Sequence, residues 1–395
     1  MARTVRGDAS ELRLFTAPFV LLGLADLAYF TSVGVAIHTL PLYVTGPLDS
    51  GEAGAGLAFG AFGVTALVCR PFAGRLSDTL GRRPLLIVGA LLAALGMLLL
   101  PHVDSLALVV AIRLLQGVAE AAFFVAGFAM LADLAPPSRM GEALSYNSLG
   151  LYLGIAFGPP LAELLLESYD FTTAWYGATV LAVAAAALVL TIAEPERDHT
   201  LEGHGKLVHR AAIPISLGFF TSLAAVSGFL AFASLHSAEI GLSNTSLALS
   251  TYGCVVVLCR IAFARVPDRL PSLPLAAASL VAIAFGLVVI AVWQQPAGLI
   301  TGCVVMAVGV TFSTPAFFAA IFATAKPSER GAAAGTASAF IDLGLGFGPI
   351  ALGVVADAEG IPSALFVGAA IALAGALWTL SLARTAASDS RVRSA

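Results

Sequence analysis

Long apolar stretches alternate with short polar connections along almost the whole chain. An α-helix of about 20 apolar residues is long enough to cross about 30 Å of hydrocarbon. We expect such helices at 16–43, 54–73, 84–101, 106–131, 142–166, 173–193, 212–238, 246–265, 273–293, 297–324, 332–356 and 361–383. The pattern therefore predicts an all-α membrane protein with twelve transmembrane helices.

The basic residues fall on alternate connections. With the N-terminus placed inside, the inner segments hold Arg3, Arg6, Arg13, Arg75, Arg82, Arg83, Arg139, Arg197, Lys206, Arg210, Arg265, Arg269, Lys326, Arg330, Arg384, Arg391 and Arg393. Arg70 and Arg260 fall at inner ends of expected helices, and the outer connections hold no lysine or arginine. Because cytoplasmic loops carry an excess of basic residues, we expect a multi-pass protein of the inner (plasma) membrane with both termini in the cytoplasm.

The two halves of the chain match each other without gaps at an offset of 190 residues. Cys69-Arg70 aligns with Cys259-Arg260, and Phe157-Gly158-Pro159 aligns with Phe347-Gly348-Pro349. Six spans per half is an even number, so the halves are parallel repeats related by an axis along the membrane normal. The repeat predicts six-helix bundles at 1–193 and 211–395, the second with a short cytoplasmic tail, joined by a cytoplasmic linker at 194–210.

The composition excludes several classes of protein. Hydrophobic residues make up 59% of the chain and charged residues 11%, whereas soluble domains carry about 25% charged residues. The four cysteines all lie within apolar spans, which indicates packing residues rather than a metal site or a disulfide framework. No phosphate-binding Gly-Lys-Ser/Thr loop occurs. We therefore expect no cofactor, no metal, no direct use of ATP, no enzymatic activity and no nucleic-acid partner.

A signature stretch follows the second expected span and reads Gly74-Arg75-Leu76-Ser77-Asp78-Thr79-Leu80-Gly81-Arg82-Arg83-Pro84. Together with the six-plus-six layout, it resembles the signature loop of the major facilitator superfamily. Three further segments are similar to the twelve-helix drug/proton antiporter branch of that family: Asp26 with Leu40-Pro41-Leu42-Tyr43, Arg113-Leu114-Leu115-Gln116-Gly117, and Gly150, Gly154, Gly158 and Pro159. The resemblance implies a secondary transporter that exchanges a small molecule for protons by alternating access.

Asp78 is an acid among arginines in the signature stretch. A carboxylate there can meet the positive N-terminus of a neighbouring helix. The resemblance implies that this helix is the eleventh, near 328–331, and by the repeat Asp268 would meet the fifth near 138–141. Such contacts would latch the halves together on the inner side and hold an outward-open state. The alternative is that Arg75, Arg82 and Arg83 only follow the charge rule.

Glycines recur every four residues in the fifth span, at Gly150, Gly154 and Gly158, and Pro159 follows them. They present a smooth face to a neighbouring helix, and the proline bends the helix beyond them. The eleventh span repeats the pattern in Gly344, Gly348 and Pro349. We interpret the paired positions as conformational hinges, with simple close packing as the alternative.

Four charged residues fall well inside the expected spans, at Asp26, Arg113, Glu120 and Asp342. Charges inside a bilayer are costly and therefore mark functional candidates. We expect Asp26 to carry the proton and Arg113 to control its ionisation by moving closer or away. Glu120 and Asp342 are further candidates, and Asp342 could instead bind a cationic substrate. The alternative for each acid is a structural hydrogen bond between helices.

Aromatic and amide side chains near the seam between the halves are candidates for the substrate cavity. They are Tyr29, Phe30, Gln116, Phe123, Phe124, Tyr146, Asn147, Phe219 and Phe220. Such a cavity suits amphipathic or lipophilic molecules. It argues against polyanions and sugars, since intramembrane basic clusters and midplane amides are scarce. Towards the outer ends, we expect His38 and His236 to form interfacial hydrogen bonds and Glu163 and Glu167 to be solvated.

The leading interpretation is a proton-coupled exporter of drugs or natural products, of the kind that confers antibiotic resistance. It would act as a monomer in membrane lipid, with a small-molecule substrate and protons as its partners. A proton-coupled importer of a small metabolite on the same scaffold is the first alternative. A non-transporting membrane receptor or regulator is the second, although such a protein usually adds a soluble domain or a long tail.

Overall fold

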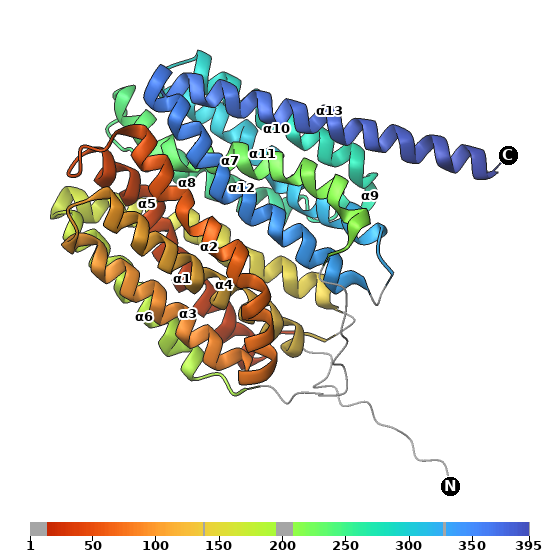
Figure 1. Ribbon diagram of the computed structural model, residues 1–395, viewed down its shortest axis with the longest axis horizontal. Coiled ribbons are helices and arrows are strands. Elements are labelled where there is room, and N and C mark those ends of the chain that lie inside the picture. The colour runs from red at the N-terminus through yellow and green to blue at the C-terminus, as the bar shows by residue number, and fades with distance from the viewer. Residues whose placement is uncertain (1–13, 137–138, 195–207, 327–328, 395) are drawn as a thin grey trace, which may run out of the picture.

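The computed structural model describes residues 14–136, 139–194, 208–326 and 329–394. Helices account for nearly all of these residues (Figure 1). Their bounds are α1 Ala17–Thr45, α2 Gly51–Leu80, α3 Arg82–Leu99, α4 Leu106–Leu134, α5 Met140–Ser168, α6 Phe171–Leu190, α7 Ile213–Glu239, α8 Leu247–Ala262, α9 Val266–Arg269, α10 Ser272–Val292, α11 Pro296–Ala323, α12 Arg330–Glu359 and α13 Ile361–Ser394. Within the described ranges, eleven helices are long and apolar enough to span a membrane, and α8 is a shorter apolar helix.

The helices follow the predicted spans closely, with one consequential difference in α2. The second span was expected to end at 73, but α2 continues through Gly74 to Leu80. The turn occurs instead at Gly81, whose φ of 120° favours a residue without a β-carbon. Most of the signature stretch is therefore helical, and Arg70 lies ten residues before the end of its helix, about 15 Å along the axis.

Local capping interactions help to set where helices begin. The Asp170 carboxylate accepts hydrogen bonds from the backbone N–H (2.7 Å) and hydroxyl (2.8 Å) of Thr173, so it caps the start of α6. These two bonds lower the pKa of Asp170. The Thr16 hydroxyl caps α1 in the same way through the Phe19 N–H (3.4 Å).

Two helical bundles, α1–α6 and α7–α13, lie side by side, the first red to yellow and the second green to blue (Figure 1). The repeat at 190 residues explains how they meet. A β-carbon added at Gly63 of α2 would lie 2.7 Å from the Gly346 backbone of α12, and one added at Gly253 of α8 would lie 2.7 Å from the Ala156 Cα of α5. Each pair is the repeat image of the other. Small residues at equivalent positions thus bring α2 against α12 and α5 against α8.

The bundles are packed together at one end of the molecule. We call this the sealed side; it carries the α1–α2, α5–α6 and α7–α8 connections. The other end, which carries the α2–α3 turn and the end of α13, is the termini side. On the sealed half, β-carbons at Gly56 and Gly60 would collide with the α12 backbone. On the termini side, β-carbons at Gly74 and Gly331 would meet no heavy atom within 4 Å.

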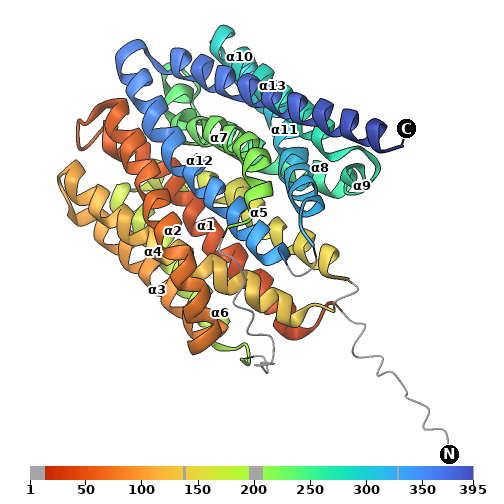
Figure 2. The same cartoon turned by 45° about the vertical axis from the view of Figure 1, so that its right-hand side comes forward.

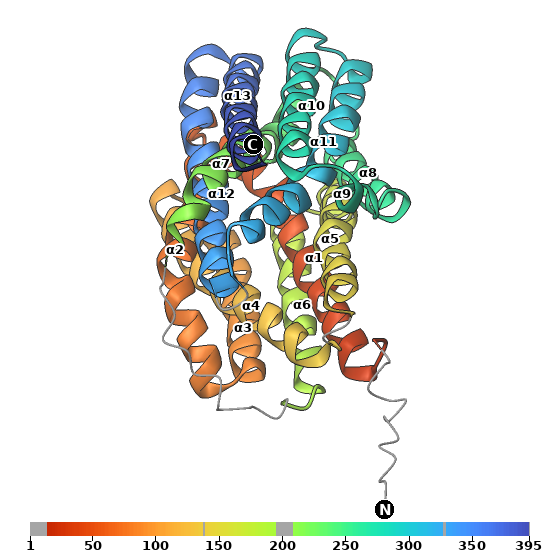
Figure 3. The same cartoon turned by 90° about the vertical axis from the view of Figure 1, so that its right-hand side faces the viewer.

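At least one helix of the second bundle, α13, differs in direction from the helices of the first, whereas α12 runs beside α2 (Figure 2). In Figure 2, α2 and α3 descend steeply whereas α13 runs to the right, and in Figure 3 the second bundle stands above the first. The tight contacts of the sealed half and the open surroundings of Gly74 and Gly331 indicate a conformation closed at the sealed side and separated at the termini side.

Candidate transport site

An ion pair joins the two bundles inside the apolar region. Arg70 of α2 donates to both carboxylate oxygens of Asp342 of α12, with 2.7 Å from Nη2 to Oδ1. Asp342 is only 2% exposed. The guanidinium group also lies over the Phe124 ring, 4.5 Å from its centroid. Asp342 was a predicted site residue, whereas its partner Arg70 was placed at a helix end because α2 was expected to be shorter.

The repeat places a second arginine at the equivalent position. Arg260 of α8 donates to the Ser148 hydroxyl (2.9 Å) and the Tyr152 hydroxyl (3.3 Å) of α5. Tyr152 stands 190 residues before Asp342, so the two arginines contact matching positions. The match of Cys69-Arg70 with Cys259-Arg260 was the sequence signal for this pair. Only the α2–α12 interface has a carboxylate at that position, and only there is the contact an ion pair.

Glu120 of α4 lies beside this ion pair. Its carboxylate accepts a hydrogen bond from the Tyr29 hydroxyl (3.0 Å), and the Tyr29 ring stacks on Phe123 with centroids 3.8 Å apart. Glu120 also interacts electrostatically with Arg70, Asp342 and Arg113. Glu120 and Asp342, predicted from opposite halves of the chain, therefore share one electrostatic environment, and Tyr29 and Phe123 support it.

Arg113 is held by backbone and amide groups of its own bundle. It donates to the carbonyl oxygens of Ala58 (3.0 Å) and Phe59 (3.2 Å) and to Gln116 Oε1 (2.7 Å). The Gln116 amide in turn contacts the Met97 sulfur at 3.3 Å. The structure does not bring Arg113 into hydrogen-bonding contact with Asp26, so the expected pairing of these two residues is absent from this conformation.

Asp26 is buried where α1 meets α4 and α5. It is 2% exposed, and β-carbons at Gly127 and Gly150 would lie 3.9 Å and 3.2 Å from its side chain. The Asn147 side chain is its polar neighbour, and Glu120 acts on it electrostatically. Of the acids Asp26, Glu120 and Asp342, Asp26 is the one for which the structure shows no interaction with an arginine.

A cavity of about 190 Å³ reaches Asn147 from the half of the molecule nearer the termini side. It is lined by Phe15, Phe19, Val20, Gly23, Leu24, Tyr146 and Asn147. The Phe15 and Tyr146 rings contact each other edge to face, with centroids 5.1 Å apart. Two predicted cavity residues, Tyr146 and Asn147, thus line this cavity, and Asn147 is also the polar neighbour of Asp26.

The other predicted cavity residues do not gather at that place. Phe219 is buried in the second bundle, stacked on Phe317 at 5.1 Å, and Phe220 contacts Gly344 through its carbonyl oxygen. Phe30 packs against Gly154, within the α1–α5 contact. Sequence position alone did not separate such packing residues from those that border open space.

The predicted hinge glycines also serve as packing surfaces. Gly150, Gly154 and Gly158 face α1, where β-carbons would crowd Asp26, Phe30 and Gly34. Gly344 and Gly348 face α7 in the same way, and the Pro349 carbonyl lies against Gly56 of α2. Close packing accounts for these contacts, and a hinge function for Pro159 and Pro349 stays a prediction.

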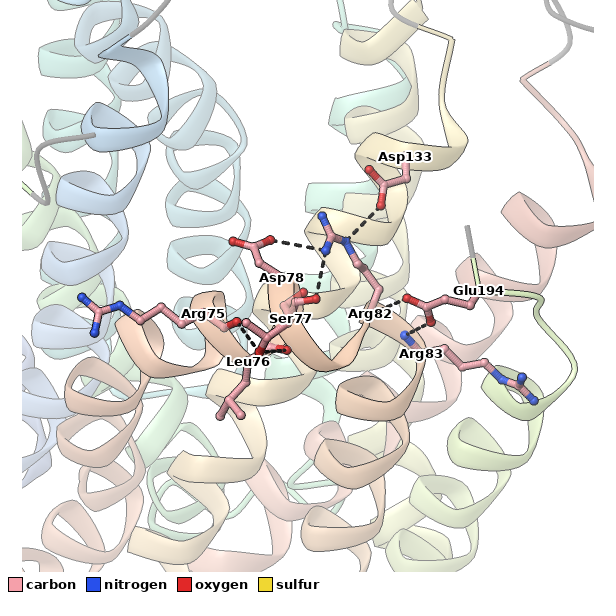
Figure 4. A network of polar contacts seen from close by, with 9 residues as sticks. Arg75, Leu76, Ser77, Asp78, Arg82, Arg83, Asp133 and Glu194 are labelled. Atoms are coloured by element: carbon pink, nitrogen blue, oxygen red, sulfur yellow. Dashed lines mark hydrogen bonds and ion pairs between the residues drawn. The ribbon is translucent and has the colours of Figure 1, made fainter. Parts of the chain in front are cut away.

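The signature stretch forms a polar network within the first bundle (Figure 4). Arg82 contacts Asp78 (3.3 Å), Asp133 of α4 (3.0 Å) and the Ser77 carbonyl (2.9 Å). The Glu194 carboxylate accepts hydrogen bonds from the backbone N–H groups of Arg82 and Arg83, both at 2.8 Å, and so caps α3. The Arg83 side chain donates to the Leu190 carbonyl, whereas Arg75 points away from this network (Figure 4).

The predicted latch joins Asp78 to the start of α12. Asp78 is 73% exposed at its side chain, and residue 328 of the expected partner 328–331 lies outside the described residues, as does residue 138 of the partner 138–141 expected for Asp268. The latch stays a prediction for a conformation closed at the termini side. A disulfide between cysteines placed at Asp78 and Gly331 would test it.

The sealed side differs from what the sequence predicted for Glu163. A solvated glutamate was expected there, but Glu163 is 8% exposed and accepts hydrogen bonds from Thr245. The contacts of the second bundle exclude water from it. Glu163 is one of the residues whose environment only the packing of the two bundles determines.

Comparison with known proteins decides the family. The family model described as Major Facilitator Superfamily matches residues 22–326 and 215–395. The chain belongs to the major facilitator superfamily. It is therefore a membrane transporter with a small-molecule substrate and is not an enzyme, as the sequence predicted.

Its relatives do not identify the substrate. The chain is 29% identical over 367 residues to an uncharacterized MFS-type transporter of Salmonella typhimurium, covering 88% of this chain and 92% of the relative. It is 28% identical over 357 residues to an uncharacterized MFS-type transporter of Burkholderia mallei, covering 88% and 87%.

Solved structures share the fold at low sequence identity. A bacterial homologue of the lysosomal transporter Spinster, in an inward-facing and occupied conformation, has a TM-score of 0.78 at 13% identity over 93% of this chain and 96% of its own. The nucleoside transporter NupG has a TM-score of 0.77 at 14% identity, covering 92% and 99%. The human organic anion transporter TETRAN has a TM-score of 0.70 at 16% identity, covering 92% and 99%.

Proposed function

We propose that the protein is a proton-coupled exporter of small amphipathic or lipophilic compounds, of the drug/proton antiporter kind. The observation that carries the proposal is the charge cluster inside the apolar region, in which Asp26 and Asp342 are buried and Arg70, Arg113 and Glu120 are half-buried. It contains three carboxylates, on Asp26, Glu120 and Asp342, and two guanidinium groups, on Arg70 and Arg113. Fully ionised, the cluster holds one negative charge in excess. An uncompensated charge in a low-dielectric interior is costly, so the cluster favours one bound proton.

Asp26 is the proposed site of this proton. Glu120 and Asp342 both interact with Arg70, whereas the polar neighbour of Asp26 is the uncharged amide of Asn147. A protonated carboxyl group is neutral, so it can hydrogen bond to a neutral amide and needs no opposite charge nearby. Loss of the proton would leave the cluster with its excess charge, which couples proton release to a rearrangement of the bundles.

The position of the cavity supports exchange between proton and substrate. The same Asn147 that neighbours Asp26 lines the cavity of about 190 Å³, whose other lining residues are apolar or aromatic, including Phe15, Phe19 and Tyr146. An amphipathic molecule would bury its apolar part there and hydrogen bond to Asn147. Its arrival would then change the environment of Asp26, as antiport requires.

Alternating access would break the contact between Arg70 and Asp342. The two residues lie on different bundles, near the middle of α2 and of α12, so a movement of α2 relative to α12 would break the contact. Asp342 would then need another cation, or a proton, to compensate its charge. The ion pair thus links the charge state of the cluster to the relative position of the bundles.

The proposed location is the inner (plasma) membrane, with the termini side in the cytoplasm. The basic residues of the expected inner segments support this orientation, as does the even number of spans. We also retain the proposed division into bundles at 1–193 and 211–395 with a linker at 194–210, most of which lies outside the described residues. Export by this route would confer resistance to toxic substrates such as antibiotics.

A transport assay tests the proposal. The purified protein is reconstituted into vesicles, a pH gradient is imposed, and a panel of amphipathic compounds is followed. We expect at least one compound to move uphill against a proton flow, and the movement to stop when a protonophore removes the gradient. Protein-free vesicles are the control. Uphill movement of compounds together with protons would instead indicate an importer, and transport that is indifferent to the gradient would contradict proton coupling.

Thiol labelling tests the orientation. A cysteine placed at Ser50, on the sealed side, is expected to react with an impermeant thiol reagent in intact cells, while one placed within 195–207 is expected to be protected until the cells are permeabilised. The reason is that the positive-inside rule puts the basic segments in the cytoplasm. Labelling in the reverse pattern would overturn the orientation.

A further inference from the structure

A buried histidine connects the two bundles at the sealed side. His38 of α1 is 0% exposed. Its Nδ1 lies 2.8 Å from the Ser234 hydroxyl of α7, and its Nε2 lies 3.0 Å from a carboxylate oxygen of Glu163 of α5. One ring nitrogen is therefore hydrogen bonded to the second bundle, and the other, which forms no hydrogen bond in this conformation, lies within ion-pair distance of a carboxylate of the first bundle.

Glu163 extends this contact to a fourth element. Its carboxylate accepts hydrogen bonds from the Thr245 backbone N–H (3.0 Å) and the Thr245 hydroxyl (2.8 Å), just before α8 begins. We call His38, Glu163, Ser234 and Thr245 the seal cluster. Two of its members belong to the first bundle and two to the second, so opening the sealed side must separate them.

The seal cluster has the composition of a proton-binding site. A doubly protonated imidazole can donate from Nδ1 to Ser234 and places its positive charge beside the Glu163 carboxylate, 3.0 Å from Nε2, which leaves the pair neutral. Without that proton, the pair retains the full negative charge of Glu163 among buried groups, which is unfavourable. When the sealed side opens, water reaches both residues, and the free-energy advantage of the protonated pair over the unprotonated pair decreases.

Other titratable groups at this end do not contact His38 in the described structure. His236 of α7 pairs with Glu239 on its own helix at 3.4 Å, and Asp357 of α12 accepts from the Ala53 N–H of α2 at 3.4 Å. The remaining acids on α1 and the elements packed around it at this end are Asp49 after α1, Glu52 on α2, Asp104 before α4, Glu167 on α5 and Asp170 before α6. Glu163 is thus the acid that faces His38.

We propose that His38 and Glu163 together bind one proton from the compartment beyond the sealed side, and that this proton stabilises the sealed conformation. The inference rests on the proposed function, since it supplies a step at which an external proton favours the return of an emptied exporter to its inward-facing state. Proton binding and closure are reciprocal: a conformation that binds the proton more tightly is favoured by acid. Histidine titrates between about pH 5 and 8, where a membrane pH gradient operates.

The test measures conformation directly, with no substrate and no gradient. Cysteines replace the exposed Asp104 and Ser243, one on each bundle at the sealed side, in a background without native cysteines, and spin labels on them report the separation. When the pH is lowered from about 8 to about 5.5, we expect the ratio of sealed to open protein to rise about tenfold in the parent. This is the change expected if the sealed conformation binds one proton about tenfold more tightly than the open one.

Single substitutions test whether the seal cluster, rather than another part of the protein, causes the pH response. His38→Gln has an amide that can hydrogen bond to Ser234 and to Glu163 but cannot titrate, so we expect the pH response to disappear. His236→Gln is the matched control, because it removes a buried histidine of the same region whose polar partner, Glu239, lies on its own helix, and it should keep the full response. Ser234→Ala should lower the sealed fraction at both pH values and keep the response, because the titrating pair remains.

Two results would contradict the proposed proton site. If His38→Gln keeps the parent's tenfold response, or if His236→Gln loses it, the inference is wrong. If His38→Gln does not yield folded protein, Glu163→Gln takes its place, with the same expected loss and the same contradicting result. The spin-label distances are measured without transport, so a negative vesicle assay would not change this result. Conversely, if the distances show no pH response, proton-coupled transport through Asp26 is still tested by the vesicle assay.

Discussion

Replacing Asp26 by asparagine is expected to abolish uphill transport while substrate binding survives. At a pH difference of about 2, exchange of one proton supports up to about a 100-fold concentration ratio of substrate, since each tenfold ratio is worth about 1.4 kcal/mol. We expect this ratio to fall to about 1 in Asp26→Asn. The variant mimics the protonated acid permanently, so the cluster keeps its neutral charge state but can no longer release a proton.

Vesicle uptake with an imposed gradient gives the ratio, and proton release on substrate binding to purified protein gives the coupling. The parent should exchange protons on binding and Asp26→Asn should not. Asp104→Asn, at an exposed acid on a connecting loop, is the control and should behave as the parent. If Asp26→Asn still accumulates substrate against the gradient, the proton is carried elsewhere, and Glu120 is the next candidate because it shares the cluster.

Loss of Arg70 is expected to be more harmful than loss of the whole ion pair. Arg70→Gln leaves the Asp342 carboxylate buried without its guanidinium partner, and breaking a buried pair in this way costs about 3–5 kcal/mol. Arg70→Gln with Asp342→Asn removes both charges and leaves two neutral groups able to hydrogen bond. We therefore expect the double variant to recover most of the stability lost in Arg70→Gln, and neither to show normal transport.

Thermal unfolding in detergent measures stability, and the yield of monodisperse protein gives an independent check. The repeat supplies a matched control in Arg260→Gln. Arg260 occupies the same position in the second half, but its partners are the uncharged hydroxyls of Ser148 and Tyr152, so its loss strands no carboxylate. An equal loss of stability in Arg70→Gln and Arg260→Gln would show that both arginines matter for packing only, and would contradict the charge argument.

The candidate site was predictable in part. Asp26, Arg113, Glu120 and Asp342 stand out because a charged residue within an apolar span is rare and costly. What the spacing could not indicate was which of them are partners. Arg113 was expected beside Asp26 but bonds to backbone carbonyls of its own bundle, while Arg70, taken for a residue at a helix end, bonds to Asp342. Helix ends near glycine and proline are the least certain part of a span, and a difference of seven residues moved Arg70 into the interior.

By itself, the sequence determined the class of protein, the number of spans, the internal repeat and the superfamily signature, since length and hydrophobicity of a helix are local properties that the bilayer selects. Tertiary structure alone decided which charges meet. Asp342 and Arg70 are 272 residues apart, and Glu163 and Thr245 are 82 residues apart, so their contacts depend on how α2 meets α12 and how α5 meets α8. Those interfaces are formed by small residues that let backbones approach, and their register, rather than the charged side chains themselves, sets which carboxylate lies beside which cation.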